Sequence, residues 1–227
     1  MKKKGTNTEN VYELIQKRLK FIFDEFDNIY VSFSGGKDSG VLLNLCIDYI
    51  RKHNLNRKIG VFHMDYEAQY KMTTDYVEET FRQNLDILEI YHVCVPFKVV
   101  TCASMYQQFW RPWDEEMHAN WVRPMPKNCY KKEDFPFYND EMWDYNFQVE
   151  FGRWYHKKKD AVRTACLVGI RTQESLDRWR KKRSGSTTPR HRPTSRRLTF
   201  ISSTASGRCS NLHYHLIMTT AKKKRKQ

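Results

Sequence analysis

The chain has 227 residues, a length that suits one α/β domain with or without an extension. No apolar run approaches the roughly 20 residues of a membrane-spanning helix, and Met1-Lys2-Lys3-Lys4 leads into polar residues, so we predict a cytoplasmic protein that does not associate with membranes. The net charge of +14 favours a nucleic-acid partner, but the first 177 residues hold 25 basic against 26 acidic residues, and the basic excess lies beyond them.

The cysteines are scattered along the chain and contain no Cys-x-x-Cys pair. In a chain without a secretion signal they are expected to be reduced thiols, and their spacing predicts neither a zinc site nor an iron–sulfur site. The six are Cys46, Cys94, Cys102, Cys129, Cys166 and Cys209.

In chain order, the first part of the sequence alternates between helical and strand patterns. Helices are expected at 9–27, 38–53 and 73–85, and strands at 29–34, 58–65 and 87–95. On the second helix, one apolar face is expected to carry Val41, Leu42, Leu45 and Tyr49. The order β-α-β-α-β predicts a parallel sheet with helices on both faces, which is a Rossmann-like α/β/α sandwich.

The middle of the chain interrupts this alternation. Residues 96–138 are rich in proline and tryptophan and are expected to form a long irregular insertion. A helix is then expected at 139–159, a strand at 164–170 and the start of another helix at 171–183. The helix at 139–159 carries an aromatic stripe that predicts packing, formed by Trp143, Phe147, Phe151 and Trp154.

From residue 184 the composition changes to Ser, Thr, Arg and Pro without periodicity. Residues 184–227 are therefore expected to be a basic tail without regular structure, following a domain at 1–183. One hypothesis is that a reading-frame change or a truncation near residue 184 produced this segment. The alternative is a basic arm that binds nucleic acid or an anionic protein.

The first strand leads directly into Ser34-Gly35-Gly36-Lys37-Asp38-Ser39, and a helix follows. Glycines let backbone N–H groups turn toward an anion, and the N-terminus of the helix adds a favourable dipole. Lys37 adds a positive charge and the two serines add hydroxyl donors. The spacing differs from that of the common P-loop and from the Gly-x-Gly-x-x-Gly of dinucleotide folds. A phosphate-binding loop of another kind is therefore expected here.

This loop resembles the pyrophosphate-binding loop of the adenine-nucleotide α-hydrolase (PP-loop) superfamily. "VFHMDYE" at 61–67 and "GIRTQESLDR" at 169–178 resemble two elements of its phosphoadenosine phosphosulfate (PAPS) reductase family. "WVRPMP" at 121–126 resembles the branch that includes the immunoglobulin-binding regulator A type.

The resemblance implies a site for an adenine nucleotide, either PAPS or ATP. Its expected nucleotide ligands are Ser34, Gly35, Gly36, Lys37, Asp38, Ser39, Gly169, Arg171, Glu174 and Arg178. Glu174 is expected to orient Arg171 or Arg178. Lys37, Asp65 and Arg171 are the expected catalytic residues. Asp65 is expected to hold Mg²⁺ or to contact the ribose, and Glu67 is a second candidate for that role.

Two further groups of residues have competing interpretations. His63 is expected to be a packing residue of its strand. Trp110, Trp113, Trp121 and Arg123 are expected to form either a lid or platform for a substrate, or a small core of their own.

The function implied by the resemblance is sulfur, sulfonucleotide or adenylyl transfer with a pyrophosphate-type leaving group. The reductases use a cysteine in a Glu-Cys-Gly-Leu-His element, which this sequence lacks. The alternative is therefore a regulatory protein that binds the nucleotide without turnover. A third interpretation, a tRNA-modifying enzyme, is weaker because the thiolating members need paired cysteines.

Overall fold

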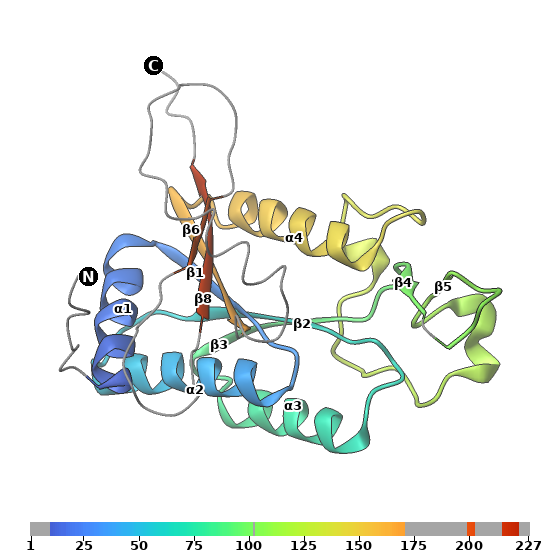
Figure 1. Cartoon of the computed structure of the whole chain (residues 1–227), viewed down its shortest axis with the longest axis horizontal. Helices are drawn as coiled ribbons and strands as arrows, with labels where there is room; N and C mark the ends of the chain where they lie inside the picture. Colours follow the sequence, from blue (N-terminus) through green and yellow to red (C-terminus); the bar gives the residue numbers. More distant parts are fainter. Residues whose placement is uncertain (1–9, 102, 171–198, 203–214, 223–227) are drawn as a thin grey trace, which may run out of the picture. The chain divides into compact units, whose positions relative to one another are not determined.

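The computed structural model describes residues 10–101, 103–170, 199–202 and 215–222, which fall into two compact units (Figure 1). The first unit contains α1 (Val11–Glu25), β1 (Asn28–Ser32), α2 (Lys37–Lys52), β6 (Arg163–Ile170), β7 (Thr199–Ser202) and β8 (His215–Lys222). The second contains β2 (Ile59–Met64), α3 (Lys71–Gln83), β3 (Leu88–Val93), β4 (Val99–Val100), β5 (Phe109–Trp110), the 3₁₀ turns η1 (Glu115–Asn120) and η2 (Lys132–Asp134), and α4 (Asp144–Lys158).

In the first unit, helix α1 begins at a complete capping box. The Asn10 side chain accepts a hydrogen bond from the Glu13 N–H at 2.9 Å, and the Glu13 carboxylate accepts one from the Asn10 N–H at 3.2 Å. The helix buries Leu19, Ile22 and Phe23, and the Phe23 ring stacks on Tyr49 of α2 with 5.0 Å between ring centroids.

Strand β6 is the centre of pairing in the first unit. It pairs in parallel with β1, in a register that runs from Asn28↔Thr164 to Ser32↔Val168. Its other edge pairs antiparallel with β8, and β8 pairs antiparallel with β7. Both β7 and β8 lie in the segment that was expected to lack regular structure, so that expectation is wrong for these two stretches. The residue types of "TFIS" and "HLIMTTAK" suit strands, although neither stretch strictly alternates polar and apolar residues.

In the second unit, β2 and β3 pair in parallel from Ile59↔Leu88 to Met64↔Val93. Helix α4 buries the rings of Phe147 and Phe151, and Phe151 stacks on Phe62 of β2 at 4.1 Å between centroids. Phe135 from the insertion meets Phe147 edge-on at 5.1 Å. The packing role of the aromatic stripe is therefore confirmed for these two rings.

The α/β class is confirmed, because β1–β6 and β2–β3 pair in parallel and helices connect the strands. Among the described residues, no helix has both the length and the apolar character needed to cross a membrane.

Candidate functional site

The predicted phosphate loop lies between the end of β1 and the start of α2, which begins at Lys37. Ser34, Gly36 and Lys37 are exposed, whereas Ser39 is buried in the first turn of the helix. Within the loop, Ser34 Oγ accepts a hydrogen bond from the Gly36 N–H at 3.3 Å. The loop therefore has the strand–turn–helix position that an anion-binding loop requires, with an exposed lysine beside the helix N-terminus.

Gly35 is required at its position for two independent reasons. Its φ of +77° lies in the left-handed region that favours glycine. A Cβ atom there would also lie 2.7 Å from Thr73 Cγ2 and 2.8 Å from Val77 Cγ2 of helix α3. Gly36 has no such constraint, since a Cβ would meet only Ser34 Oγ, at 3.3 Å. The turn is thus shaped by Gly35 packing against α3.

Gly169 of β6 contacts the first turn of α2. A Cβ atom at Gly169 would lie 2.6 Å from the Asp38 carbonyl oxygen and 2.9 Å from Ser39 Cα. The structure therefore brings together three of the predicted site residues, Gly169, Asp38 and Ser39. This contact lets the helix N-terminus approach the strand, so Gly169 positions the loop whether or not it also contacts a ligand. Arg171, Glu174 and Arg178 lie outside the described residues, as does the helix expected at 171–183.

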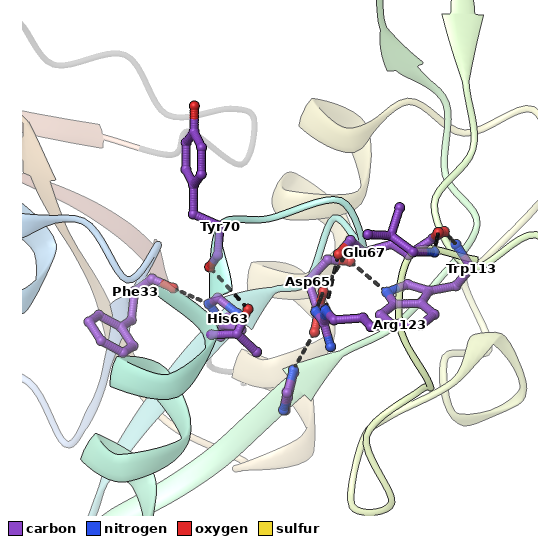
Figure 2. A network of polar contacts seen from close by, with 10 residues as sticks. Phe33, His63, Asp65, Glu67, Tyr70, Trp113 and Arg123 are labelled. Carbon is purple, nitrogen blue, oxygen red and sulfur yellow. Dashed lines mark hydrogen bonds and ion pairs between the residues drawn. The ribbon is translucent and has the colours of Figure 1, made fainter. Parts of the chain in front are cut away.

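Asp65 follows β2 and is the centre of a buried polar cluster (Figure 2). Its Oδ2 lies 2.8 Å from His92 Nε2, and its Oδ1 accepts hydrogen bonds from the Glu67 N–H at 2.9 Å and from the Arg123 guanidinium. Burial alone would raise the pKa of Asp65, but the hydrogen bonds from His92 and Arg123 and the charge of Arg123 outweigh it and lower the pKa to about 2. Asp65 is therefore ionised, and both of its oxygens are occupied.

Glu67 connects the end of β2 to the insertion. Its two carboxylate oxygens each accept a backbone hydrogen bond at 2.9 Å, one from Trp113 and one from Val122. The Arg123 Nε donates to the Glu67 carbonyl at 3.1 Å. Glu67 itself has a φ of +61°, which the surrounding hydrogen bonds hold in place. Glu67 is thus a structural anchor for the segment 113–123.

The tryptophans of the insertion form a small core around this anchor. Trp113 is 1% exposed and donates its Nε1–H to the Asp65 carbonyl at 2.9 Å. Trp121 meets it edge-on at 5.2 Å between centroids, and Arg123 lies over the Trp113 ring at 4.9 Å. Of the two interpretations of these residues, the geometry of Trp113, Trp121 and Arg123 matches a small core. Trp110 belongs to strand β5.

His63 and His92 are register partners on adjacent strands. His63 is buried, as a packing residue should be, and its Nδ1 lies 2.7 Å from the Phe33 carbonyl oxygen (Figure 2). Burial, with a smaller effect from His92, lowers the pKa of His63 to about 4, so its imidazole is neutral at pH 7. Its Nδ1 therefore donates to Phe33 as the neutral tautomer.

Cys94 and Cys129 form a thiol pair that the sequence spacing did not reveal. Backbone pairing places them together, because Cys94 N–H donates to the Tyr130 carbonyl at 2.9 Å and Tyr130 N–H donates to the His92 carbonyl at 2.7 Å. The hydrogen bond between the thiols lowers the pKa of Cys129 to about 7, against the effect of its burial and with help from His92 and Lys131. The same hydrogen bond, with burial, raises the pKa of Cys94.

Sequence reasoning missed His92, Cys94 and Cys129 as members of this site. The available signal was that His92 and Cys94 alternate at the end of a strand, which directs both to one face of the sheet. Cys129 carried no comparable signal, because it reaches the cluster through an irregular insertion. The conclusion that paired cysteines are absent is therefore wrong for the folded chain, although it holds for the linear sequence.

Residues 28–192 match the phosphoadenosine phosphosulfate reductase domain family, which covers more than half of the chain. The chain belongs to this family. It is also 34% identical over 172 residues to the uncharacterized protein YbdN of Escherichia coli strain K12. That alignment covers 75% of the chain but only 41% of YbdN. In this PAPS reductase-family chain, the loop at 34–39, Asp65, the Cys94–Cys129 pair and Arg171 all lie inside the matched range.

Proposed function

We propose that the chain binds an adenine nucleotide, PAPS or ATP, at the loop Ser34–Ser39 and uses it for sulfonucleotide or adenylyl transfer. The observation that carries the proposal is the loop itself, which leads from β1 to the N-terminus of α2 with the exposed Lys37 at the first helical position. In this proposal the backbone N–H groups and Lys37 hold the phosphates, and Arg171 and Arg178 add charge from the matched region. Family membership supports the nucleotide class.

The proposed site acts mainly through positioning and charge. Lys37 and the N-terminus of α2 would stabilise the negative charge that develops on a pyrophosphate-type leaving group. Gly169 supports this role indirectly, because its contact with Asp38 fixes the direction of the helix N-terminus. We also propose that the chain falls in the immunoglobulin-binding regulator A-like branch, on the strength of the "WVRPMP" segment.

The Mg²⁺ role expected for Asp65 does not fit the donor set around it. Magnesium prefers oxygen ligands and keeps several waters. Asp65 instead shares its oxygens with His92, Arg123 and the Glu67 N–H, and its carboxylate is 1% exposed. Any magnesium that accompanies the nucleotide would therefore be held by phosphate oxygens and by residues other than Asp65.

A regulatory protein without turnover is the second candidate. It is favoured by the absence of the Glu-Cys-Gly-Leu-His element from the sequence. The enzyme is favoured by the Cys94–Cys129 pair, because thiol chemistry needs an accessible thiolate in electropositive surroundings and Cys129 is half-buried beside His92 and Lys131.

Calorimetry with ATP, PAPS and adenylyl sulfate tests the binding proposal. Lys37→Ala should weaken nucleotide binding at least about 10-fold, since a lost charge-assisted hydrogen bond costs roughly 1.5–3 kcal/mol. Lys52→Ala, at the other end of α2, is the matched control and should bind like the wild type. Equal affinity of Lys37→Ala and the wild type would exclude the loop as the phosphate site.

Turnover assays then separate the enzyme from the regulator. Pyrophosphate release from ATP and, with a dithiol supplied as the two-electron reductant, sulfite release from PAPS are measured with the wild type and with Cys129→Ser. Product release by the wild type supports an enzyme, and loss of sulfite release in Cys129→Ser assigns the thiol. Nucleotide binding without either product supports the regulator.

A further inference from the structure

Three potential metal-ligating side chains converge in the buried cluster of the second unit. Ligand atoms of His63, Asp65 and His92 all lie within 4.8 Å of one another, and all three residues are buried. Figure 2 shows His63 and Asp65 side by side at the end of β2, with Arg123 and Glu67 beyond Asp65. His63 lies in β2, His92 lies in the adjacent strand β3, and Asp65 follows β2, so the regular strand backbone sets the geometry of the cluster.

Strand geometry explains why these side chains share one face. His63 and His92 are directly paired across the parallel β2–β3 ladder, and side chains in register project to the same side of a sheet. Asp65 follows His63 by two residues, which returns its side chain to that side. The Asp65 N–H also donates to the Val93 carbonyl at 2.9 Å, which continues the ladder past His63. The three groups are therefore preorganised by the sheet.

Supporting hydrogen bonds orient two of the three side chains. The Phe33 carbonyl accepts from His63 Nδ1 at 2.7 Å, which leaves the lone pair of His63 on Nε2. A backbone carbonyl holding the second ring nitrogen is the usual support of a metal-binding histidine. Asp65 Oδ1 is held by Arg123 and by the Glu67 N–H, whereas Oδ2 is directed at His92 Nε2. One carboxylate oxygen is thus fixed and the other faces the histidines.

The buried carboxylate of Asp65 is the negatively charged group to which a cation could bind. The Asp65 carboxylate is buried and forms an ion pair with Arg123, whose Nε donates to the backbone carbonyl of Glu67. A metal ion between His92 Nε2 and Asp65 Oδ2, which lie 2.8 Å apart, would place a second positive charge against this buried carboxylate.

The donor types decide which ion suits the site. Two imidazoles and one carboxylate match zinc, iron and related divalent transition metals, whereas magnesium and calcium prefer sets of oxygen ligands. We infer that His63, Asp65 and His92 form a binding site for a divalent transition-metal ion of the Zn²⁺ or Fe²⁺ class. The ion would replace the proton shared by His92 Nε2 and Asp65 Oδ2. This inference is independent of nucleotide binding, so either can hold if the other fails.

The test uses the full chain, purified without a histidine tag, stripped with EDTA and dialysed. It is titrated with ZnCl₂ alone against a chromophoric chelator, and bound metal is counted by mass spectrometry. We expect one equivalent of Zn²⁺ per chain and no saturable binding of Mg²⁺ in the same range. The double variant His63→Gln/His92→Gln should lose Zn²⁺ affinity by more than the roughly 10- to 100-fold that a supporting hydrogen bond contributes.

Matched variants exclude other zinc ligands. His53→Gln and His118→Gln remove exposed histidines, and His213→Gln/His215→Gln removes the His-x-His of the C-terminal segment. These variants should still bind one equivalent of Zn²⁺ per chain, and so should Cys129→Ser. Loss of zinc in any of them, or retention in His63→Gln/His92→Gln, would overturn the assignment.

A measurement on the wild type covers the case in which the double variant does not fold. Addition of ZnCl₂ should shift the ring ¹⁵N resonances of His63 and His92 and leave that of His53 unchanged. Unshifted His63 and His92 resonances at saturating zinc would show that these residues are not zinc ligands.

Discussion

At the scale of single residues, the thiols of this chain differ sharply in their surroundings. Cys46 and Cys166 are buried, and burial raises the pKa of each to about 12. Cys129 is half-buried and hydrogen-bonded to Cys94, and its pKa is lowered to about 7. Because the thiolate is the reactive form, these values rank the cysteines by reactivity.

Alkylation with iodoacetamide in EDTA should therefore modify Cys129 well before Cys46 and Cys166. Near pH 7 about half of Cys129 is ionised, so its rate should rise through pH 6–8 and then level off. The rates of Cys46 and Cys166 should stay low and still be rising at pH 9. Peptide mapping by mass spectrometry gives each rate separately. A pH-independent Cys129 rate, or equal rates at all three positions, would contradict the ranking.

At the scale of elements, Asp65 and Glu67 link the end of β2 to the segment 113–123 of the insertion. The two backbone N–H groups of Trp113 and Val122 find their acceptors on the Glu67 carboxylate, and the Trp113 indole finds its acceptor on Asp65. When a buried donor loses its acceptor, the folded state loses far more free energy than an average exposed hydrogen bond contributes to stability. The segment 113–123 therefore depends on Glu67 more than on any exposed carboxylate near it.

Glu67→Ala should lower the free energy of unfolding by about 2–4 kcal/mol, because two donors lose their acceptor. Urea unfolding followed by tryptophan fluorescence measures the change. Glu116→Ala, which removes an exposed carboxylate of η1, is the control and should change stability by less than about 0.5 kcal/mol. If both variants unfold at the same urea concentration as the wild type, Glu67 does not anchor the insertion.

The elements that the sequence predicted well are those with a strong period. The bounds of α1, β1, α2, β2, β3 and β6 fall within about two residues of the expected ones. The face of α2 was placed less well, since Val41 is 40% exposed while Leu43, Cys46 and Ile47 are buried. A helix with apolar residues on several sides leaves its orientation to tertiary packing, which periodicity alone does not determine.

The candidate site was only partly predictable for a related reason. The loop at 34–39 is contiguous, so its strand–turn–helix context could be inferred. The cluster around Asp65 combines β2, β3 and an irregular insertion, and the partners Arg123 and Cys129 reach it through turns that have no periodic signal. The sequence singles out Asp65 as a candidate, but it could not show that both oxygens of this carboxylate are already shared.

At the scale of the whole molecule, strand β8 covers one edge of β6. Their antiparallel register runs from Arg163↔Lys222 to Ile170↔His215, so the outer edge of β6 is paired along most of its length. An uncovered edge strand presents unpaired N–H and C=O groups, which favours association with other chains. The C-terminal segment therefore contributes to the sheet in addition to carrying the basic excess.

Truncation after residue 183 should expose this edge and promote self-association. Size-exclusion chromatography with light scattering should show larger species for the truncated chain than for the full chain at the same concentration. A full-length variant with Lys223, Lys224 and Lys226 changed to Gln keeps β8 and controls for the loss of charge. A truncated chain that behaves like the full chain would show that β8 is dispensable.

The anchor of the insertion also has a consequence for how the chain is made. Glu67, Asp65 and both strands beneath them precede the segment 113–123 in the sequence. During synthesis they leave the ribosome first, so the acceptor residues are available as soon as the donors of segment 113–123 appear. The order of the sequence therefore allows the insertion to make its contacts with Asp65 and Glu67 without waiting for the C-terminal part of the chain.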